Sequence, residues 1–278
     1  MKKNKYYFYD LHTHTKKSPD SISTIKQLIK IAKKRGLTGL AITDHDKVYQ
    51  GEEKIDGITI IPGSEITLKD DSHLLAYYIK EALPAKKLTL AEAVTAIKKQ
   101  GGYCSLAHPT NKKGGYFKSG GYLKIKKRKI KEIKRALEIV DGIEIGNAHE
   151  TKQLRTSAKK IAESLFFKKI WTAGSDSHSP SSLGFGVVKT KEPLTKKNFF
   201  KVIKEGEIIV KTKFNFIKRI LYFIEKLFIM FFKTTFLYNN KIMRKIFYKI
   251  FFKTYLKIKY FLFKKKKTFN FQKEYNSN

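Results

Sequence analysis

Cysteine is almost absent from this chain of 278 residues, in which Cys104 stands alone. A single cysteine excludes a disulfide framework, and its apolar surroundings between Tyr103 and Leu106 predict a buried packing residue. Long apolar runs are also absent, since no segment offers the ~20 uninterrupted apolar residues of a membrane-spanning helix. These absences predict a chain without a transmembrane segment that works in a reducing cytoplasm.

Acidic residues are scarce: 24 Asp and Glu stand against 59 Lys and Arg, which gives a formal net charge of +35. Such a charge predicts a polyanionic partner, either nucleic acid or an anionic membrane surface. A second interpretation is compositional, because Lys, Ile, Phe, Tyr and Asn are enriched together, as an A/T-rich genome would produce. Composition alone leaves both interpretations open.

Up to about Val210, short β-branched or aromatic runs alternate with amphipathic segments, which is the pattern of βα units around a parallel sheet. Strands are predicted over 6–11, 39–43, 58–61, 74–79, 103–107, 142–145 and 170–173. Helices are predicted over 23–35, 89–100, 128–139, 151–165 and 195–205, the first with Ser23 as N-cap and Gly36 just past its end. Residues 1–210 are therefore expected to form one α/β domain.

The composition changes abruptly at Lys211. Residues 211–278 carry 18 Lys and Arg against two acidic residues, a net charge of +16, together with about twenty Phe or Tyr. Lysines recur every four residues from Lys241 to Lys257, which draws a basic stripe along a helix. The pattern predicts a basic, aromatic-rich tail of amphipathic helices that contacts nucleic acid or holds the protein peripherally at an anionic membrane.

Nearly all of the seven histidines lie in short clusters with acidic residues or other histidines. The candidate metal ligands are His12, His14, Asp20, His45, Glu65, His73, His108, Asp176 and His178. Imidazoles and carboxylates bind divalent transition metals where thiolates are absent. Several of these residues fall at or just beyond the carboxyl ends of predicted strands, where parallel-sheet enzymes build active sites. They predict one metal site assembled from many segments.

The spacing of individual residues supports this site. His12 and His14 are two apart at the end of a strand, so both side chains project from the same face. Glu65 follows residues 61–64, interpreted as a turn, where a carboxylate could bridge two ions. Any one of the histidines taken singly is more often structural, but the ordered set favours a metal centre.

The motifs DLHTHT (10–15), SPD (18–20), ITDHD (42–46), GSEI (63–66), HLLAY (73–77), AHP (107–109), IEIGNA (143–148) and GSDSH (174–178) resemble, in this order, those of the PHP (polymerase and histidinol phosphatase) family of metal-dependent phosphoesterases. The resemblance covers roughly residues 6–210 and is strongest to the compact form with a PHP-associated C-terminal segment. It implies a distorted (β/α)7 barrel with two or three divalent metal ions. Mn is favoured, with Zn or Fe as alternatives.

The resemblance also implies how the ligands are shared. His12, His14, Glu65 and Asp176 would hold one ion, Glu65 would bridge to a second ion held by His73 and His108, and Asp20, His45 and His178 would hold a third. Asp44 and Asp46 are expected to orient histidines rather than to bind metal. His149 matches no ligand position and is expected to face solvent, with a substrate contact as the alternative.

Phosphoester hydrolysis is the expected reaction. A water that bridges two divalent cations loses a proton near neutral pH, and the resulting hydroxide attacks phosphorus while the ions neutralise charge on the oxygens. The residues expected to act in catalysis are Glu65, Asp176, His178 and Asp44.

The substrate is expected to be a nucleotide or short oligonucleotide, cut as by a nucleotide phosphatase or a 5′–3′ exonuclease, because the basic surface favours phosphate-rich molecules. Relatives of that kind carry a sizeable insertion, whereas only about 35 residues separate His108 from Glu144 here. A phosphatase of small metabolites or phosphoproteins is the alternative within the same fold. A membrane- or RNA-binding module with structural metals is the alternative of another class, and it would require an incomplete ligand set.

Overall fold

The computed structural model describes residues 5–117, 127–164, 170–211 and 269–275. Its strands are β1 (Tyr7–Thr13), β2 (Gly39–Ile42), β3 (Lys54–Ile55), β4 (Ile58–Thr67), β5 (His73–Tyr77), β6 (Tyr103–Leu106), β7 (Gly142–Asn147), β8 (Ile170–Gly174), β9 (Gly186–Thr190) and β10 (Glu207–Val210). Its helices are α1 (Ile25–Arg35), α2 (Leu90–Lys99), α3 (Lys127–Ile139), α4 (Lys152–Ser164), α5 (Phe199–Lys204) and α8 (Phe271–Tyr275).

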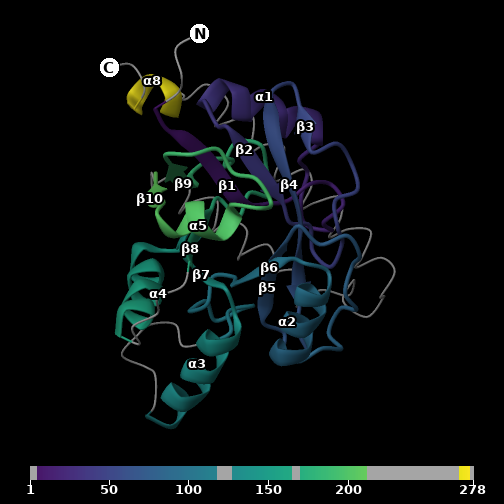
Figure 1. Ribbon diagram of the computed structural model, residues 1–278, viewed down its shortest axis with the longest axis vertical. Coiled ribbons are helices and arrows are strands. Elements are labelled where there is room, and N and C mark those ends of the chain that lie inside the picture. The colour runs from purple at the N-terminus through teal and green to yellow at the C-terminus, as the bar shows by residue number, and fades with distance from the viewer. Residues whose placement is uncertain (1–4, 118–126, 165–169, 212–268, 276–278) are drawn as a thin grey trace, which may run out of the picture.

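The strands form one sheet in the order β10-β9-β1-β2-β4-β5-β6-β7-β8, with β3 paired to β4 outside this path. The sheet curls until β8, the last strand in this order, returns beside β1: Asp176, just after β8, donates its N–H to the carbonyl of His12 in β1 at 2.8 Å. Helices α1, α2, α3 and α4 lie on the outside of this nearly closed barrel (Figure 1). The predicted α/β barrel is therefore confirmed.

The pairing is mixed rather than wholly parallel, which corrects the expectation of a parallel sheet. β5 runs antiparallel to both β4 and β6, and β9 runs antiparallel to β1 and β10. Residues 68–72 alone join β4 to β5, too few for the crossover that parallel strands need. This departure from βα alternation is the distortion of the barrel.

Glu65 lies inside β4, so the interpretation of residues 61–64 as a turn is wrong. β4 pairs with β2 as far as Pro62 and with β5 from Gly63 onward, so the chain changes partner at this point. Proline is tolerated where ladder pairing changes, since it has no N–H to donate. A Cβ on Gly63 would lie 2.5 Å from the carbonyl oxygen of Ala76, so only glycine allows this close approach.

Helix α1 shows how local sequence sets element boundaries. Thr24, rather than the predicted Ser23, is its N-cap, and Thr24 and Gln27 form a reciprocal capping box. Gly36 ends the helix at φ 66°, as predicted, in the left-handed conformation that glycine adopts without strain. Ser23 is instead buried beside the loop that follows β1.

The interior of the barrel is apolar below the predicted ligands. Tyr9, Leu11, Ile61 and Tyr77 belong to this buried cluster. Phe199 of α5 closes it at the end of the strands away from His108, with its ring centroid 5.2 Å from those of Tyr77 and Tyr103. Full burial of one such aromatic side chain stabilises a fold by about 1.5–3 kcal/mol. Cys104 is buried, as predicted.

Helix α8 packs where α1 ends and β1 begins (Figure 1). Phe271 is fully buried, with its ring stacked 4.9 Å from that of Phe8. The Asn270 side-chain amide donates to the carbonyl of Lys34 at 3.1 Å. Residues 269–275 therefore contribute to the core, while the domain boundary at residue 210 stays a prediction.

Most of the predicted amphipathic tail, residues 212–268, lies outside the described residues. Among the residues that the structure does describe, no helix has both the length and the apolar character needed to cross a bilayer.

Candidate metal centre

All nine predicted metal ligands lie together at one end of the barrel. The loops after β1, β2 and β8 supply His14, His45 and Asp176 among others, and the hairpin of β4 and β5 supplies Glu65 and His73. His108 follows β6. Residues up to 166 positions apart in the sequence thus meet at one edge of the sheet, as predicted from their positions after strands.

Glu65 is the centre of this arrangement. Its Oε1 lies 3.0 Å from Nδ1 of His73 and 2.9 Å from Nε2 of His108. Its Oε2 lies 3.4 Å from Nε2 of His12 and of His14, and 3.1 Å from Nδ1 of His45. The two oxygens of one buried carboxylate therefore face different imidazoles, which is the geometry that a bridging ligand needs.

Asp176 faces two of these imidazoles. Its Oδ1 lies 3.6 Å from Nε2 of His12 and 3.3 Å from Nε2 of His14. Its backbone has φ 51°, and that of His108 has φ 27°, in the left-handed region that non-glycine residues rarely adopt. Strain of this kind persists where the surrounding structure holds a side chain in one orientation.

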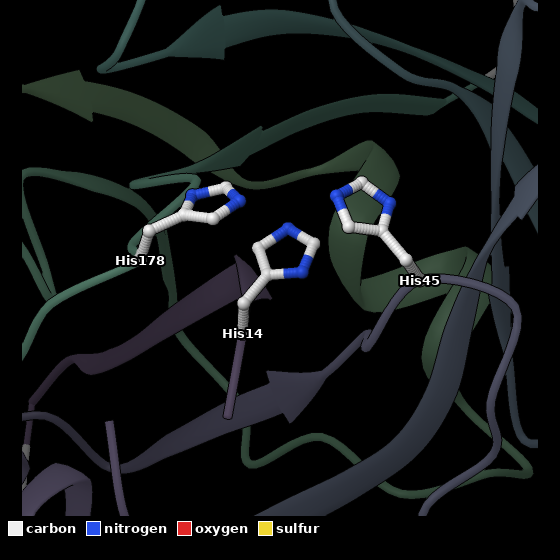
Figure 2. A group of neighbouring side chains, drawn as sticks. All are labelled: His14, His45 and His178. Atoms are coloured by element: carbon white, nitrogen blue, oxygen red, sulfur yellow. The ribbon is translucent and has the colours of Figure 1, made fainter. Parts of the chain in front are cut away.

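Asp20, His45 and His178 form a partly exposed group within the centre. Oδ2 of Asp20 lies 3.1 Å from Nε2 of His178 and 3.5 Å from Nε2 of His45. Figure 2 shows the rings of His14, His45 and His178 converging from three loops, and nitrogen atoms of all three lie within 4.8 Å of one another. The side chains of His45 and His73 are 20% and 21% exposed, whereas that of His14 is fully buried, so a ligand approaches from the side of His45 and His73.

The donor set fits divalent cations. Nε2 of His12 and Nε2 of His14 are 3.1 Å apart, so two potential lone-pair donors converge within the buried part of the site. Oδ1 of Asp20 and Nδ1 of His108 are buried and have no hydrogen-bond partner among the described residues. Buried polar atoms of this kind are costly unless a ligand or ion satisfies them.

The same proximity shifts the protonation of the site. Burial lowers the pKa of His45 and of His108, but hydrogen bonds and charge from Asp20 and Glu65 outweigh it and raise both to about 9. Burial raises the pKa of Glu65, but the neighbouring histidines bring it well below its usual value. The centre without metal therefore holds protons where cations would bind, and protons and metal compete for it.

His14 is the exception. Burial and the neighbouring imidazole of His178 lower its pKa to about 4. It is therefore neutral at pH 7, in the form that binds metal without releasing a proton.

Asp44 holds two ligand-bearing loops together. Its carboxylate accepts hydrogen bonds from the backbone and side chain of Thr15 and of Ser18. Ser18 Oγ in turn lies 3.1 Å from Nδ1 of His14. Asp44 thus positions His14 through Ser18, whereas Asp46 bonds the backbone and hydroxyl of Thr67 and orients no histidine directly.

Glu144 is a functional residue that the sequence analysis missed. It is fully buried, and its Oε1 lies 3.1 Å from Nδ1 of His12. Its Oε2 accepts the N–H of His108 at 2.8 Å and the amide of Asn147 at 3.0 Å. A carboxylate on the second nitrogen of a metal-binding imidazole fixes its orientation and raises its basicity. The sequence feature that could have identified Glu144 is its position between two isoleucines in a predicted strand, because a buried carboxylate needs a partner.

His149 lies at the rim of the centre. Its side chain is 63% exposed, as expected, and its Nδ1 lies 4.0 Å from Oδ2 of Asp176. The predicted helix start at Thr151 is confirmed to within one residue, since α4 begins at Lys152.

Glycine allows the closing strands to approach the ligands. A Cβ on Gly174, at the end of β8, would lie 2.2 Å from the Cβ of His12. Gly114 has φ 77°, and a Cβ there would lie 2.8 Å from the His73 ring. Any larger side chain at Gly174 would separate β8 from β1 and move the ligands on both strands.

Known proteins resemble this chain over the same region. MJ1587, an uncharacterised protein of Methanocaldococcus jannaschii, is 35% identical over 115 residues, which are 36% of this chain and 66% of that protein. YcdX of Escherichia coli K12, a probable phosphatase, is 24% identical over 210 residues, which are 64% of this chain and 81% of that protein.

Solved structures share the fold. PsfC from Pseudomonas syringae PB-5123 superposes with a TM-score of 0.54 at 16% identity, over 74% of this chain and 91% of that one. The lesion-specific endonuclease PfuEndoQ from Pyrococcus furiosus superposes with a TM-score of 0.52 at 17% identity, over 74% of this chain and 57% of that one. The sequence profile of the PHP domain matches residues 10–169, which carry seven of the nine residues at this centre and more than half of the chain. On that match this chain belongs to the PHP domain family.

Proposed function

We propose that this protein is a metal-dependent phosphoesterase that hydrolyses phosphate esters of nucleotides or short oligonucleotides. As a PHP domain with a probable phosphatase among its relatives, it is a hydrolase acting on phosphoester bonds. The observation that carries the proposal is Glu65, whose two oxygens face different histidines.

The distances support the proposed distribution of ligands among ions. His12, His14 and Asp176 lie on one side of Glu65, and His73 and His108 on the other. Asp20, His45 and His178 would hold a third ion on the exposed side. Two or three divalent ions, with Mn²⁺ favoured over Zn²⁺ or Fe²⁺, would polarise the phosphoryl group and supply a nucleophilic water.

The protein's own side chains would hold the ions and orient the histidines that bind them. Glu65 is a buried carboxylate and Asp176 a partly buried one, and both bring negative charge to cations, which compensates for their loss of hydration. Asp44 and Glu144 keep His14 and His12 in one orientation. His178, on the open side, faces the approaching ester.

Charge favours a phosphate-rich substrate. The net charge of +35 attracts nucleotides and nucleic acid, since neutralised phosphates supply most non-specific affinity. The fold is compatible with such a substrate: endonuclease Q, whose structure superposes with a TM-score of 0.51 at 16% identity, has been crystallised with a duplex that carries an abasic lesion at its active site.

A phosphatase of small metabolites or phosphoproteins is the second candidate. The alignment with YcdX, a probable phosphatase, over 81% of its length favours it.

The test is a substrate screen with the full-length protein after Mn²⁺ loading. We expect chelator-sensitive hydrolysis of an aryl phosphate and faster turnover of 5′-phosphorylated oligonucleotides than of sugar or amino-alcohol phosphates. Faster turnover of the small phosphates would select the second candidate. Less than one ion per chain by metal analysis, with no aryl phosphate hydrolysis, would overturn the phosphoesterase itself.

A further inference from the structure

A basic groove lies beside the candidate centre. It encloses about 430 Å³ and is lined by Lys17, Lys47, Val48, Gln50 and Ala82. Both lysines are exposed, and no acidic side chain lines the groove. The groove is therefore open to solvent and positively charged.

The two lysines have no competing acidic partner. Lys47 Nζ donates to the backbone carbonyl of Lys17 at 3.0 Å, which holds its ammonium group at the groove. Within the part of the chain that the structure describes, neither ammonium group forms an ion pair. Other lysines do so, as Lys86 does with Asp71. Two unneutralised cations that line one groove favour an anionic ligand.

The groove is fixed to the metal centre through the backbone. Lys17 lies on the loop that carries His14 and Asp20, and Lys47 lies two residues after His45. The Asp44 carboxylate joins these two loops through Ser18, and Ser18 Oγ accepts the N–H of His45 at 3.1 Å. The groove thus shares two loops with the part of the centre that holds Asp20 and His45, where a substrate approaches.

We propose that Lys17 and Lys47 form a subsite for the phosphodiester backbone of a single-stranded nucleic acid, adjacent to the ester held at the metal centre. This inference rests on the proposed function and narrows its substrate class. A single phosphate group fills only the centre. A strand has further phosphates, and two ammonium groups on a groove beside the centre would bind them without reading sequence.

Competition measures occupancy of this subsite whether or not the strand is cut. Full-length protein loaded with Mn²⁺ hydrolyses an aryl phosphate while a short single-stranded oligothymidylate is added as inhibitor. We expect Lys17→Ala/Lys47→Ala to raise the inhibition constant of the oligothymidylate, relative to the KM of the aryl phosphate, on the order of tenfold at low salt. A plot of the logarithm of this inhibition constant against the logarithm of the salt concentration should have a slope smaller by about 1.4, because the variant no longer neutralises two phosphates of a single strand.

Lys30→Ala/Lys34→Ala is the matched control. It removes the same charge from exposed positions on α1 and should leave the inhibition constant within about twofold, since screening weakens distant charges. Thermal unfolding midpoints check that both variants fold. Equal effects of the two double variants, or no inhibition of the wild type, would overturn the subsite while leaving the phosphoesterase in place. Absence of aryl phosphate hydrolysis in the wild type would overturn the proposed function and this inference with it.

Discussion

The two ends of the barrel are built from different side chains. At the end where β1, β2 and β8 finish, imidazoles and carboxylates fill the interior, and Glu65 and His12 are almost completely buried. At the opposite end, buried aromatic rings take their place: Phe199 lies among three tyrosines inside the barrel, and Phe271 is stacked on Phe8 outside it, in the cluster beside α1.

The two ends of the barrel therefore have opposite effects on the stability of the fold. Buried charges and positive φ angles at His108 and Asp176 raise the free energy of the folded chain at the first end. Apolar burial at the second end lowers it. Substitutions at the first end should therefore change metal binding and activity, and those at the second should change stability.

The strongest test of this comparison is Glu65→Gln. The substitution removes the charge that the surrounding histidines share, so we expect at least a ~10³-fold loss of aryl phosphate turnover together with loss of bound metal. Asp46→Asn is the control, because Asn accepts its φ of 53° and only the bonds to Thr67 change. Equal metal content and activity in the two variants would refute the bridging role of Glu65.

Glu144→Gln should have a smaller effect on the metal centre than Glu65→Gln, because Glu144 contacts the proposed ligand His12 and not the ion itself. Loss of its charge beside His12 should lower metal affinity about 10- to 100-fold. Isothermal titration calorimetry with Mn²⁺ measures the metal affinity of the variant and of the wild type. If affinity is unchanged but the unfolding midpoint falls, Glu144 has a structural role only.

Metal affinity should depend on pH with a defined sign. His45 and His108 have pKa values raised to about 9 in the absence of metal, so both carry protons at pH 7 that a cation must displace. Raising the pH from 7 towards 9 removes these protons and should increase Mn²⁺ affinity, by about tenfold per unit for each proton released. Calorimetry in buffers of different ionisation enthalpy counts the protons. Affinity that stays constant or falls over this range would contradict the protonated state.

Phe271→Ala should have the smallest effect on chemistry. Loss of a fully buried ring costs about 3–5 kcal/mol of stability, visible as a lower thermal midpoint. Metal content and aryl phosphate turnover below that temperature should stay within about twofold of wild type. A matched loss of metal would show that the two ends of the barrel are coupled.

Predictions from the sequence succeeded where the signal was local. Apart from β3 and the end of β4, strand and helix positions up to β8 agree to within a few residues, because alternating runs, Gly36 and the Thr89 cap act over short distances. Where the signal depended on distant partners they were incomplete. β3, β9 and β10 were not predicted, and β4 continues through Pro62 only because β5 takes over its pairing there.

The same division holds for the candidate site. The sequence by itself determined which imidazoles and carboxylates are available, their order and the family to which they belong, because these depend only on residue type and spacing. Only the tertiary structure decided that Oε1 and Oε2 of Glu65 face different histidines, that Glu144 orients His12, and that Phe271 returns to the core beside Phe8. Each of these is a contact between segments far apart in sequence, and the direction of a side chain follows from strand pairing and register, which no local pattern specifies.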